Sequence, residues 1–165
     1  MRIFESVREG FKYGMVIGLL RDFIKAGGYS LVYFPSREAT QLAERYQDVR
    51  ETIDGIKEGK YFGMTLTGSR LIIVMKTSYP KANAFMLLHE YSHILSRDGN
   101  LNQPKLGHSP EFFKKEEEVC NLLGIEELQE YPEYYDEDGN YIEGSRERKM
   151  EGILTKAHQR TVRNP

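Results

Sequence analysis

An apolar stripe with a helical period is the first regular feature of the chain. Between residues 7 and 24, apolar side chains recur every three to four positions, and Gly27 and Gly28 follow. This spacing places them on one face of an α-helix, which the two glycines end. The stripe consists of Val7, Phe11, Met15, Val16, Leu19, Leu20, Phe23 and Ile24.

A short strand and a second helix are predicted next. Leu31 to Phe34 is an apolar run that Pro35 stops, which is typical of a strand. Ser36 is a natural N-cap for a helix that continues to about Gln47. The polar residues 48–60 predict either a weak helix or a connecting loop.

Two hairpins are predicted from paired runs around turn residues. Residues 61–66 and 70–75 flank Thr67-Gly68-Ser69, and residues 134–142 contain Asp138-Gly139-Asn140. Within the first hairpin, Leu71 to Met75 is either a sheet edge that could hold an extended substrate or, more frequently for such a run, an internal core strand. Strands and helices without regular β-α alternation favour an α+β fold.

Two further helices follow. Residues 84–95 are mostly apolar, and residues 110–123 hold a second apolar pattern interrupted by charges. Both segments are flanked by residues that commonly begin or end helices. These are Ser78 or Tyr79, Pro80 and Gly99 for the first helix, and Ser109, Pro110 and Gly124 for the second.

The first of these helices carries an H-E-x-x-H motif at residues 89–93. Residues four apart lie on one face of a helix, so His89 and His93 can direct two imidazoles toward one ion. Zinc accepts such nitrogens at about 2.0–2.1 Å, and a catalytic site keeps one position for water. Glu90 is rotated about 100° round the helix from His89. Its carboxylate could therefore take a proton from that water as a general base.

A third ligand is expected downstream, and two kinds of residue can supply it. His108 follows His93 by fifteen residues and directly precedes the residue that caps the next helix. It is the preferred ligand, because the cap and the phenylalanines at 112 and 113 would orient it. Downstream carboxylates are rivals, although they also suit the first turns of a helix without any metal. These rivals are Glu111, Glu116, Glu117 and Glu118.

The same residues also have plain structural explanations. H-E-x-x-H occurs in some helices by chance, with histidines that are packed or solvated. A less favoured alternative is that His108 is a surface residue at the entrance of a helix. Against these readings, the motif lies in an apolar helix, where buried polar groups need partners. Zinc binding by His89, His93 and His108 is therefore the favoured interpretation.

The pairing of H-E-Y-S-H at residues 89–93 with G-H-S-P-E-F at residues 107–112 resembles the catalytic core of SprT/Spartan-like metalloproteases. The resemblance covers about residues 61–123. It implies that His89, His93 and His108 bind zinc and that Glu90 is the general base. It also implies a zincin-like core, in which a small mixed or antiparallel sheet packs on the H-E-x-x-H helix. The family acts on proteins bound or crosslinked to DNA, usually with stimulation by DNA.

The chain departs from this family in its cysteine content. Many relatives carry a cysteine-rich zinc ribbon after the core, whereas Cys120 is the one cysteine here. A second, cysteine-based zinc site is therefore not expected, and a ribbon's contribution to DNA binding is missing. Cys120 lies in an apolar helical pattern, which predicts a core residue rather than a nucleophile.

The composition fits one compact domain. The chain has 165 residues, of which 39% are hydrophobic and 29% charged, and this length is enough for a single core. We assign residues 1–143 to one domain and residues 144–165 to a basic tail. No internal disulfide can form, and neither a secretory signal nor a membrane-spanning run is evident, so an intracellular location is expected.

Charge is distributed unevenly along the chain. The formal net charge of −2 is not that of a dedicated nucleic-acid binder. Residues 126–143 are strongly acidic, whereas residues 145–165 contain six Lys or Arg against two Glu. The tail is predicted to be either a phosphate-binding arm for DNA or a solvated, partly disordered terminus. His158 lies in this tail and is not expected to bind metal.

Two functions of different classes remain open. The first is a zinc endopeptidase that acts on DNA-associated proteins; the presence of Glu90 favours it, since a structural zinc needs no base. The second is a non-catalytic zinc-containing module that binds DNA or protein. A repressor-cleaving peptidase of the ImmA/IrrE kind is a subsidiary alternative, for which an acidic third ligand would be expected. A peptidase also needs an oxyanion stabiliser, and the candidates are Tyr61, Arg70, Tyr134, Tyr135 and Tyr141.

Overall fold

A computed structural model describes residues 9–96, 108–138, 142 and 148–163. It confirms a mixed α+β fold, mostly helical with one three-stranded sheet. Two short 3-10 helices, η1 and η2, follow the fifth α-helix. The elements in chain order are α1 (Glu9–Ala26), β1 (Ser30–Phe34), α2 (Arg37–Arg45), α3 (Gln47–Lys57), β2 (Gly63–Leu66), β3 (Leu71–Met75), α4 (Pro80–Ser96), α5 (Pro110–Leu123), η1 (Glu126–Leu128), η2 (Pro132–Tyr134) and α6 (Arg148–Arg163).

The sheet has the strand order β1-β3-β2, with β1 parallel and β2 antiparallel to β3. The predicted hairpin at residues 61–75 is therefore present as β2 and β3. All five residues of β3 are buried, because β3 has a neighbouring strand on each side and helices on both faces. The suggestion that Leu71 to Met75 forms a sheet edge is wrong, and the alternative of an internal strand is confirmed.

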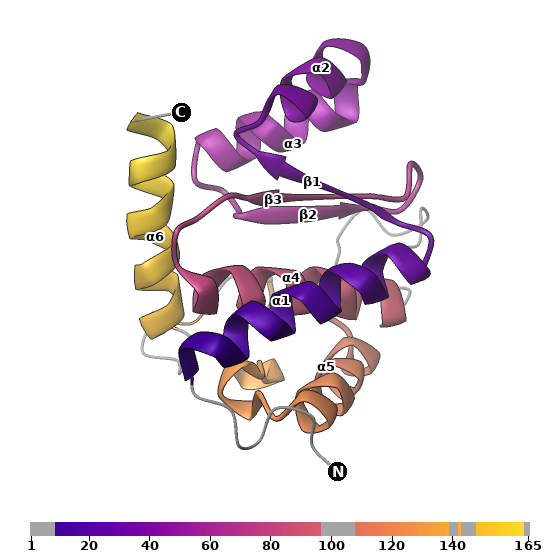
Figure 1. Cartoon of the computed structure of the whole chain (residues 1–165), viewed down its shortest axis with the longest axis vertical. Helices are drawn as coiled ribbons and strands as arrows, with labels where there is room; N and C mark the ends of the chain where they lie inside the picture. The colour runs from indigo at the N-terminus through magenta and orange to yellow at the C-terminus, as the bar shows by residue number, and fades with distance from the viewer. Residues whose placement is uncertain (1–8, 97–107, 139–141, 143–147, 164–165) are drawn as a thin grey trace.

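The elements form layers, with the sheet between two groups of helices. In Figure 1, α2 and α3 lie above the sheet, α1 and α4 lie below it, and α5 lies below α4. The helix α4 contacts α1, α5 and the sheet. This position explains why Ala84 to Leu88 are apolar at every position and all buried, since this part of α4 is packed between α1, α5 and the sheet.

Side-chain caps place the helix boundaries close to the predicted positions. The Oγ atom of Ser36 accepts the N–H of Ala39 at the start of α2. Ser109 does the same for Phe112 at the start of α5. Gly124 follows α5 in the left-handed conformation, with φ of 75°, which glycine adopts without the steric cost of a Cβ. The end predicted for α4, Gly99, lies outside the described residues.

Residues 47–57 form the helix α3, so the first of the two alternatives for this segment is confirmed. Val49, Ile53 and Ile56 share one face of the helix and are buried. Gly55 lies under the ring of Tyr61, where a Cβ atom would overlap the phenol. The glycine that weakened the helical pattern therefore allows Tyr61 to pack closely on α3, and a larger residue there would displace the phenol.

The predicted hairpin at residues 134–142 is described only in part. Gly139, Asn140 and Tyr141 lie outside the described residues. The N–H of Ile142 donates to the carbonyl of Tyr134 at 2.8 Å, which brings the two ends of the segment together. Tyr134 itself ends the 3-10 helix η2, so its backbone is not that of a regular strand.

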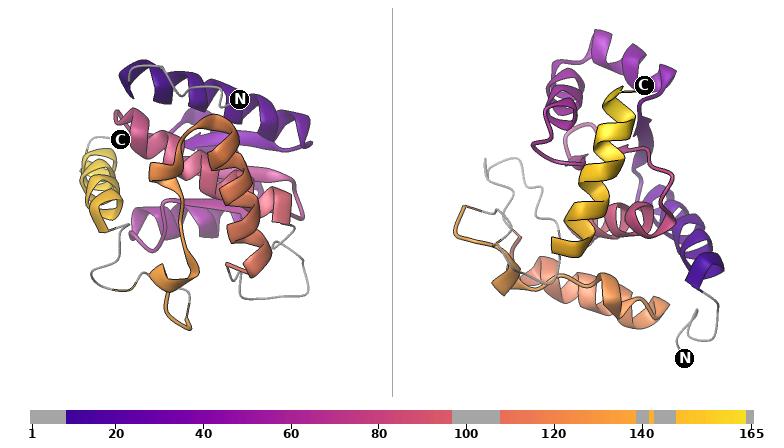
Figure 2. Two further views of the ribbon diagram at one scale, coloured as in Figure 1. Left: turned by 90° about the horizontal axis from the view of Figure 1, so that it is seen from below. Right: turned by 90° about the vertical axis from the view of Figure 1, so that its left-hand side faces the viewer.

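The basic C-terminal segment contains a helix that packs on the domain. In α6, Leu154 and Ala157 are buried, and the Nε2–H of His158 donates to the carbonyl of Ile56. Figures 1 and 2 show α6 along one side of the molecule, from the level of α4 to that of α3. Residues 144–147 lie outside the described part of the chain. Among the described helices, none combines the length and apolar character needed to cross a membrane.

Candidate metal centre

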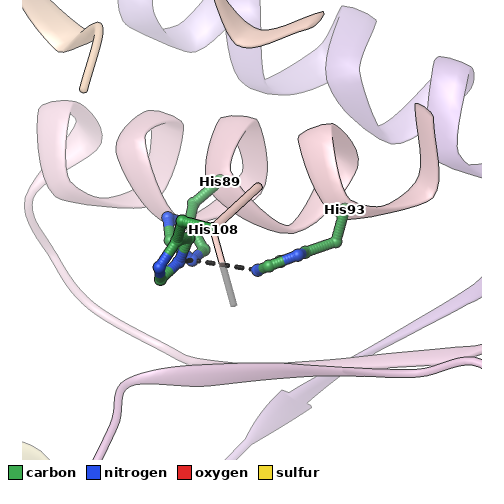
Figure 3. A group of neighbouring side chains, drawn as sticks. All are labelled: His89, His93 and His108. Carbon is green, nitrogen blue, oxygen red and sulfur yellow. Dashed lines mark hydrogen bonds between the residues drawn. The ribbon is translucent and has the colours of Figure 1, made fainter. Parts of the chain in front are cut away.

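Three imidazoles from two elements converge beside α4. The Nε2 atom of His89 lies 3.2 Å from Nε2 of His93, one turn further along α4. It lies 3.1 Å from Nε2 of His108, which immediately precedes the cap of α5. Figure 3 shows the rings of His89 and His108 together, with the ring of His93 directed toward them. These residues are named the imidazole cluster below.

The spacing of the imidazole cluster fits a tetrahedral metal ion. Two nitrogens held at about 2.0–2.1 Å by one tetrahedral ion lie about 3.3–3.4 Å apart, close to the observed separations. Burial and then the His89 ring lower the pKa of His108 to about 3. Burial, followed by His89 and His108, lowers the pKa of His93 well below its ordinary value. Both rings are therefore neutral near pH 7, the form in which imidazole binds metals.

Aromatic side chains enclose the imidazole cluster. The ring centroid of Phe112 lies 5.1, 4.7 and 4.8 Å from those of His89, His93 and His108 respectively. Tyr135 stacks on His108 with a centroid distance of 4.3 Å. These ring contacts restrict the rotamers that the three histidines can adopt.

Glu90 lies on the neighbouring face of α4 and points toward β2. It is 5% exposed, and its Oε2 atom accepts the hydroxyl of Thr65 at 2.5 Å. Burial raises the pKa of Glu90, while the His89 ring and the Thr65 hydrogen bond act in the opposite direction. A Cβ atom at Gly63 would lie 3.1 Å from Oε1 of Glu90, so a side chain there would crowd the carboxylate.

Two buried carboxyl groups, Glu116 and Glu130, lie close to His89 and are named the carboxyl pair below. Oε1 of Glu130 lies 2.6 Å from Nδ1 of His89, and Oε2 accepts the hydroxyl of Tyr135. Oε1 of Glu116 accepts the backbone N–H of Glu130. Burial and then the Glu130 carboxylate raise the pKa of Glu116 well above its ordinary value.

Two groups in the described residues are therefore close enough to hold a metal ion: the imidazole cluster, and His89 with the carboxyl pair. The two groups differ in how many of their ligand atoms already accept hydrogen bonds from other protein groups. Both oxygens of Glu130 and one oxygen of Glu116 already accept hydrogen bonds. The three Nε2 atoms of the imidazole cluster face one another. The imidazole cluster therefore has the more available lone pairs.

A cavity of about 390 Å³ opens beside these residues. It is lined by His89, Glu90 and His108 on its polar side. The remaining wall comes from β2, the segment before it, the middle of α4, the residue after η2, and α6. The apolar side chains in this wall are Tyr61, Phe62, Phe85, Met86, Tyr135 and Leu154. The wall of the cavity thus contains both the polar residues of the candidate site and a set of apolar side chains.

The other predicted site residues have different places. Among the rival ligands, Glu116 belongs to the carboxyl pair, whereas Glu111, Glu117 and Glu118 are exposed on α5.

Of the candidates for the oxyanion stabiliser, Tyr135 contacts both His108 and Glu130. Tyr61 lines the cavity, and its hydroxyl donates to the carbonyl of Glu51. Arg70 lies in the β2–β3 turn near Gly28, and Tyr134 packs on Tyr131. Tyr141 lies outside the described residues.

Two contributors to the site were missed from the sequence. Glu130 is 41 residues from His89, in an acidic stretch that resembles a solvated surface segment. Thr65 is a strand residue without any motif, although its inward position follows from alternation along β2. Neither carries a local sequence signal for its partner.

The comparisons with known proteins do not extend this description. No protein-family model, no curated protein and no solved structure matches the chain.

Proposed function

We propose that this protein is a zinc-dependent endopeptidase resembling the SprT/Spartan proteases, with a zincin-like core. The observation that carries the proposal is the convergence of three imidazoles beside a buried carboxylate and a partly apolar cavity. Burial lowers the pKa of two of these rings, His93 and His108, and so favours their neutral, metal-binding form. His89, His93 and His108 would hold zinc, which needs nitrogen ligands of this kind and an open coordination position.

The zinc ion would polarise a peptide carbonyl and increase the acidity of a water molecule. In this arrangement Glu90 acts as the general base and then returns the proton to the departing amine. Thr65 holds one oxygen of the Glu90 carboxylate, which leaves Oε1 for the proton transfer. The buried position of Glu90 raises its pKa and so makes it a stronger base than a solvated carboxylate.

Substrate binding is proposed to use β2 and the adjoining cavity. The strand β2 is at one edge of the described sheet, and its first residue, Gly63, lines the cavity next to Glu90. An extended peptide can add to such an edge by main-chain hydrogen bonds. The wall formed by Phe85, Met86 and Leu154 would receive an apolar side chain of the substrate.

The action on DNA-associated proteins rests on the sequence resemblance together with the basic C-terminal segment. Within α6, Lys156 and Arg160 are exposed, and Arg160 also lies over the ring of Tyr79 at 5.5 Å from its centroid. Exposed cations on this helix could contact phosphates next to the cavity, because Leu154 and Thr155 of the same helix line it.

The test is cleavage of a basic DNA-binding protein by the purified chain loaded with one equivalent of zinc, with and without single-stranded DNA. We expect cleavage that a chelator stops, that added zinc restores, and that DNA increases. Cleavage that persists after metal removal would contradict the zinc mechanism. Zinc-dependent cleavage without any effect of DNA would contradict the proposed role on DNA. Tight zinc binding without cleavage of any tested substrate would favour a non-catalytic binding module.

A further inference from the structure

We propose that Glu130 is a positioning residue that fixes the tautomer and orientation of His89, so that the Nε2 lone pair of His89 faces the other two imidazoles. The inference rests on the ligand set of the proposed function. It adds a residue from the segment after α5 to a site otherwise formed by α4 and the start of α5.

The three imidazoles differ in the hydrogen bonding of Nδ1, the ring nitrogen that does not face the other imidazoles. Nδ1 of His89 is 2.6 Å from Oε1 of Glu130. Nδ1 of His93 and Nδ1 of His108 are buried without a hydrogen-bond partner among the described residues. Those two rings are instead packed against Phe112 and, for His108, against Tyr135. Glu130 therefore gives His89 a directional restraint that the other two rings lack.

The hydrogen bonds around Glu130 determine where the proton of His89 lies. Glu130 is fully buried, and the hydroxyl of Tyr135 donates to its Oε2. A carboxylate is an acceptor for both oxygens, so Oε1 requires the proton on Nδ1 of His89. The bond made by one ring nitrogen fixes the state of the other. Nε2 of a neutral His89 must then carry a lone pair, which is the form that binds a metal ion.

Glu130 is itself held from two sides. Oε1 of Glu116, a residue of α5 with no exposed surface, accepts the backbone N–H of Glu130. Tyr135 donates to Glu130 and also stacks on His108. The segment 130–135 thus connects the restraint on His89 with the packing of His108. A carboxylate that accepts a hydrogen bond from the non-coordinating nitrogen of a ligand histidine orients the ring and raises its basicity.

The direct test is the tautomer of His89 in the metal-free protein, measured by the ¹⁵N chemical shifts of its ring. The wild-type chain should show the proton on Nδ1. Glu130→Ala should lose this preference, and Glu130→Gln should retain it, because the amide oxygen can still accept the bond. Glu127→Ala is the matched control: Glu127 is a nearby carboxylate that binds Lys12 and Tyr13 instead. An unchanged Nδ1–H tautomer in Glu130→Ala would overturn the inference.

The second readout is zinc affinity, measured by competition with a chelator. Removal of an outer-shell partner typically weakens metal binding by about 10- to 100-fold, which we expect for Glu130→Ala. Glu130→Gln should lose less, and Glu127→Ala should match the wild type. If Glu130→Ala does not fold, Tyr135→Phe serves instead, because it keeps the ring stacked on His108 and removes the donor to Glu130; it should weaken zinc binding several-fold. Wild-type affinity in all of these variants would contradict the inference.

These outcomes are separable from failure of the proposed function. A chain that binds zinc, shows the Glu130 effects and cleaves no protein would retain the positioning role and lose the peptidase assignment. A zinc-dependent peptidase whose His89 tautomer and zinc affinity are independent of Glu130 would retain the activity and lose the positioning role.

Discussion

The two halves of the molecule differ in what they bury. In α1, β1, α2 and α3, and in the central strand β3, the buried side chains described are aliphatic or aromatic except for Thr52, whose hydroxyl donates to the carbonyl of Asp48 within the same helix. Around α4, α5 and the following segment, the buried side chains include three carboxyl groups and an imidazole. These are Glu90, His93, Glu116 and Glu130.

This difference distinguishes an apolar core from the surroundings of the proposed metal site. Burial of an apolar side chain favours folding, whereas burial of an ionisable group opposes it unless partners compensate. Four such groups around α4 and α5 lower stability relative to an apolar core of the same volume. Their concentration around His89 is the arrangement that the proposed metal site requires, and substitutions in the two halves can test that proposal.

The largest effect is expected from Glu90→Gln, which keeps the side-chain volume and removes the base. General acid–base residues contribute about 10²- to 10⁴-fold, so kcat should fall by about that factor in a peptide-cleavage assay. Zinc affinity should stay within a few-fold of wild type, because Glu90 is not among the proposed ligands. The same substitution at the exposed Glu111 of α5 is the control. Equal rates for Glu90→Gln and wild type would remove Glu90 from the mechanism.

In the apolar half of the comparison, Ile72→Ala should reduce stability and spare the chemistry. Ile72 is fully buried in the central strand, and such truncations cost about 2–5 kcal/mol of unfolding free energy. Ile72→Val should cost only about 0.5–1.5 kcal/mol. Denaturant unfolding measures both values, and chelator competition measures zinc affinity below the unfolding transition. A large loss of zinc affinity in folded Ile72→Ala would show that the two regions are not separable.

An intermediate effect is expected for Thr65→Val, which is nearly isosteric and removes the hydroxyl that donates to Oε2 of Glu90. A buried acceptor left without its donor costs about 1–3 kcal/mol. We expect kcat/KM to fall by about tenfold at pH 7. Thr65→Ser, which retains the hydroxyl, should recover most of the rate. Wild-type kinetics in Thr65→Val would mean that this hydrogen bond does not hold Glu90 in place.

The smallest effect is expected at the wall of the cavity. Leu154→Ala enlarges the apolar side of the cavity, and it should shift cleavage toward substrates with larger apolar side chains by up to about tenfold in kcat/KM. Ala157→Gly is the control, because it weakens α6 by about 1 kcal/mol at a buried position outside the cavity lining. A peptide library cleaved with the same profile by both variants would exclude Leu154 as a specificity determinant.

Much of this arrangement could be predicted from local sequence patterns. The caps at Ser36 and Ser109 and the stop at Gly124 depend on interactions within a few residues, so the sequence predicts them well. The four-residue spacing of His89 and His93 likewise fixes their common face. The cap at Ser109 likewise places His108 directly before a helix, and each of these inferences uses a contact that is local in the chain. The approach of His108 to His89, 19 residues earlier, is not of this kind.

What could not be predicted depends on contacts between distant segments. The pairing of β3 with β1, which makes Leu71 to Met75 an internal strand, joins residues about 40 positions apart. Glu130 reaches His89 across a similar separation, and acidic neighbours give its segment the composition of a surface. The sequence of α6 shows only an excess of basic residues. Its packing on the domain uses two buried side chains, Leu154 and Ala157, which are too few to give a clear apolar pattern. Contacts between distant segments have no fixed spacing in the sequence from which they could be predicted.

The most direct test is the zinc stoichiometry and affinity of the wild-type chain beside His93→Ala, His108→Ala and Glu116→Gln. Loss of one of three protein ligands should weaken binding by about 3–4 kcal/mol, on the order of 100- to 1000-fold, given the about 10–16 kcal/mol typical of four-ligand sites. We expect one zinc per wild-type chain, a loss of this size in both histidine variants, and little change in Glu116→Gln. Zinc retained by both histidine variants, or lost only in Glu116→Gln, would contradict a metal site at the imidazole cluster.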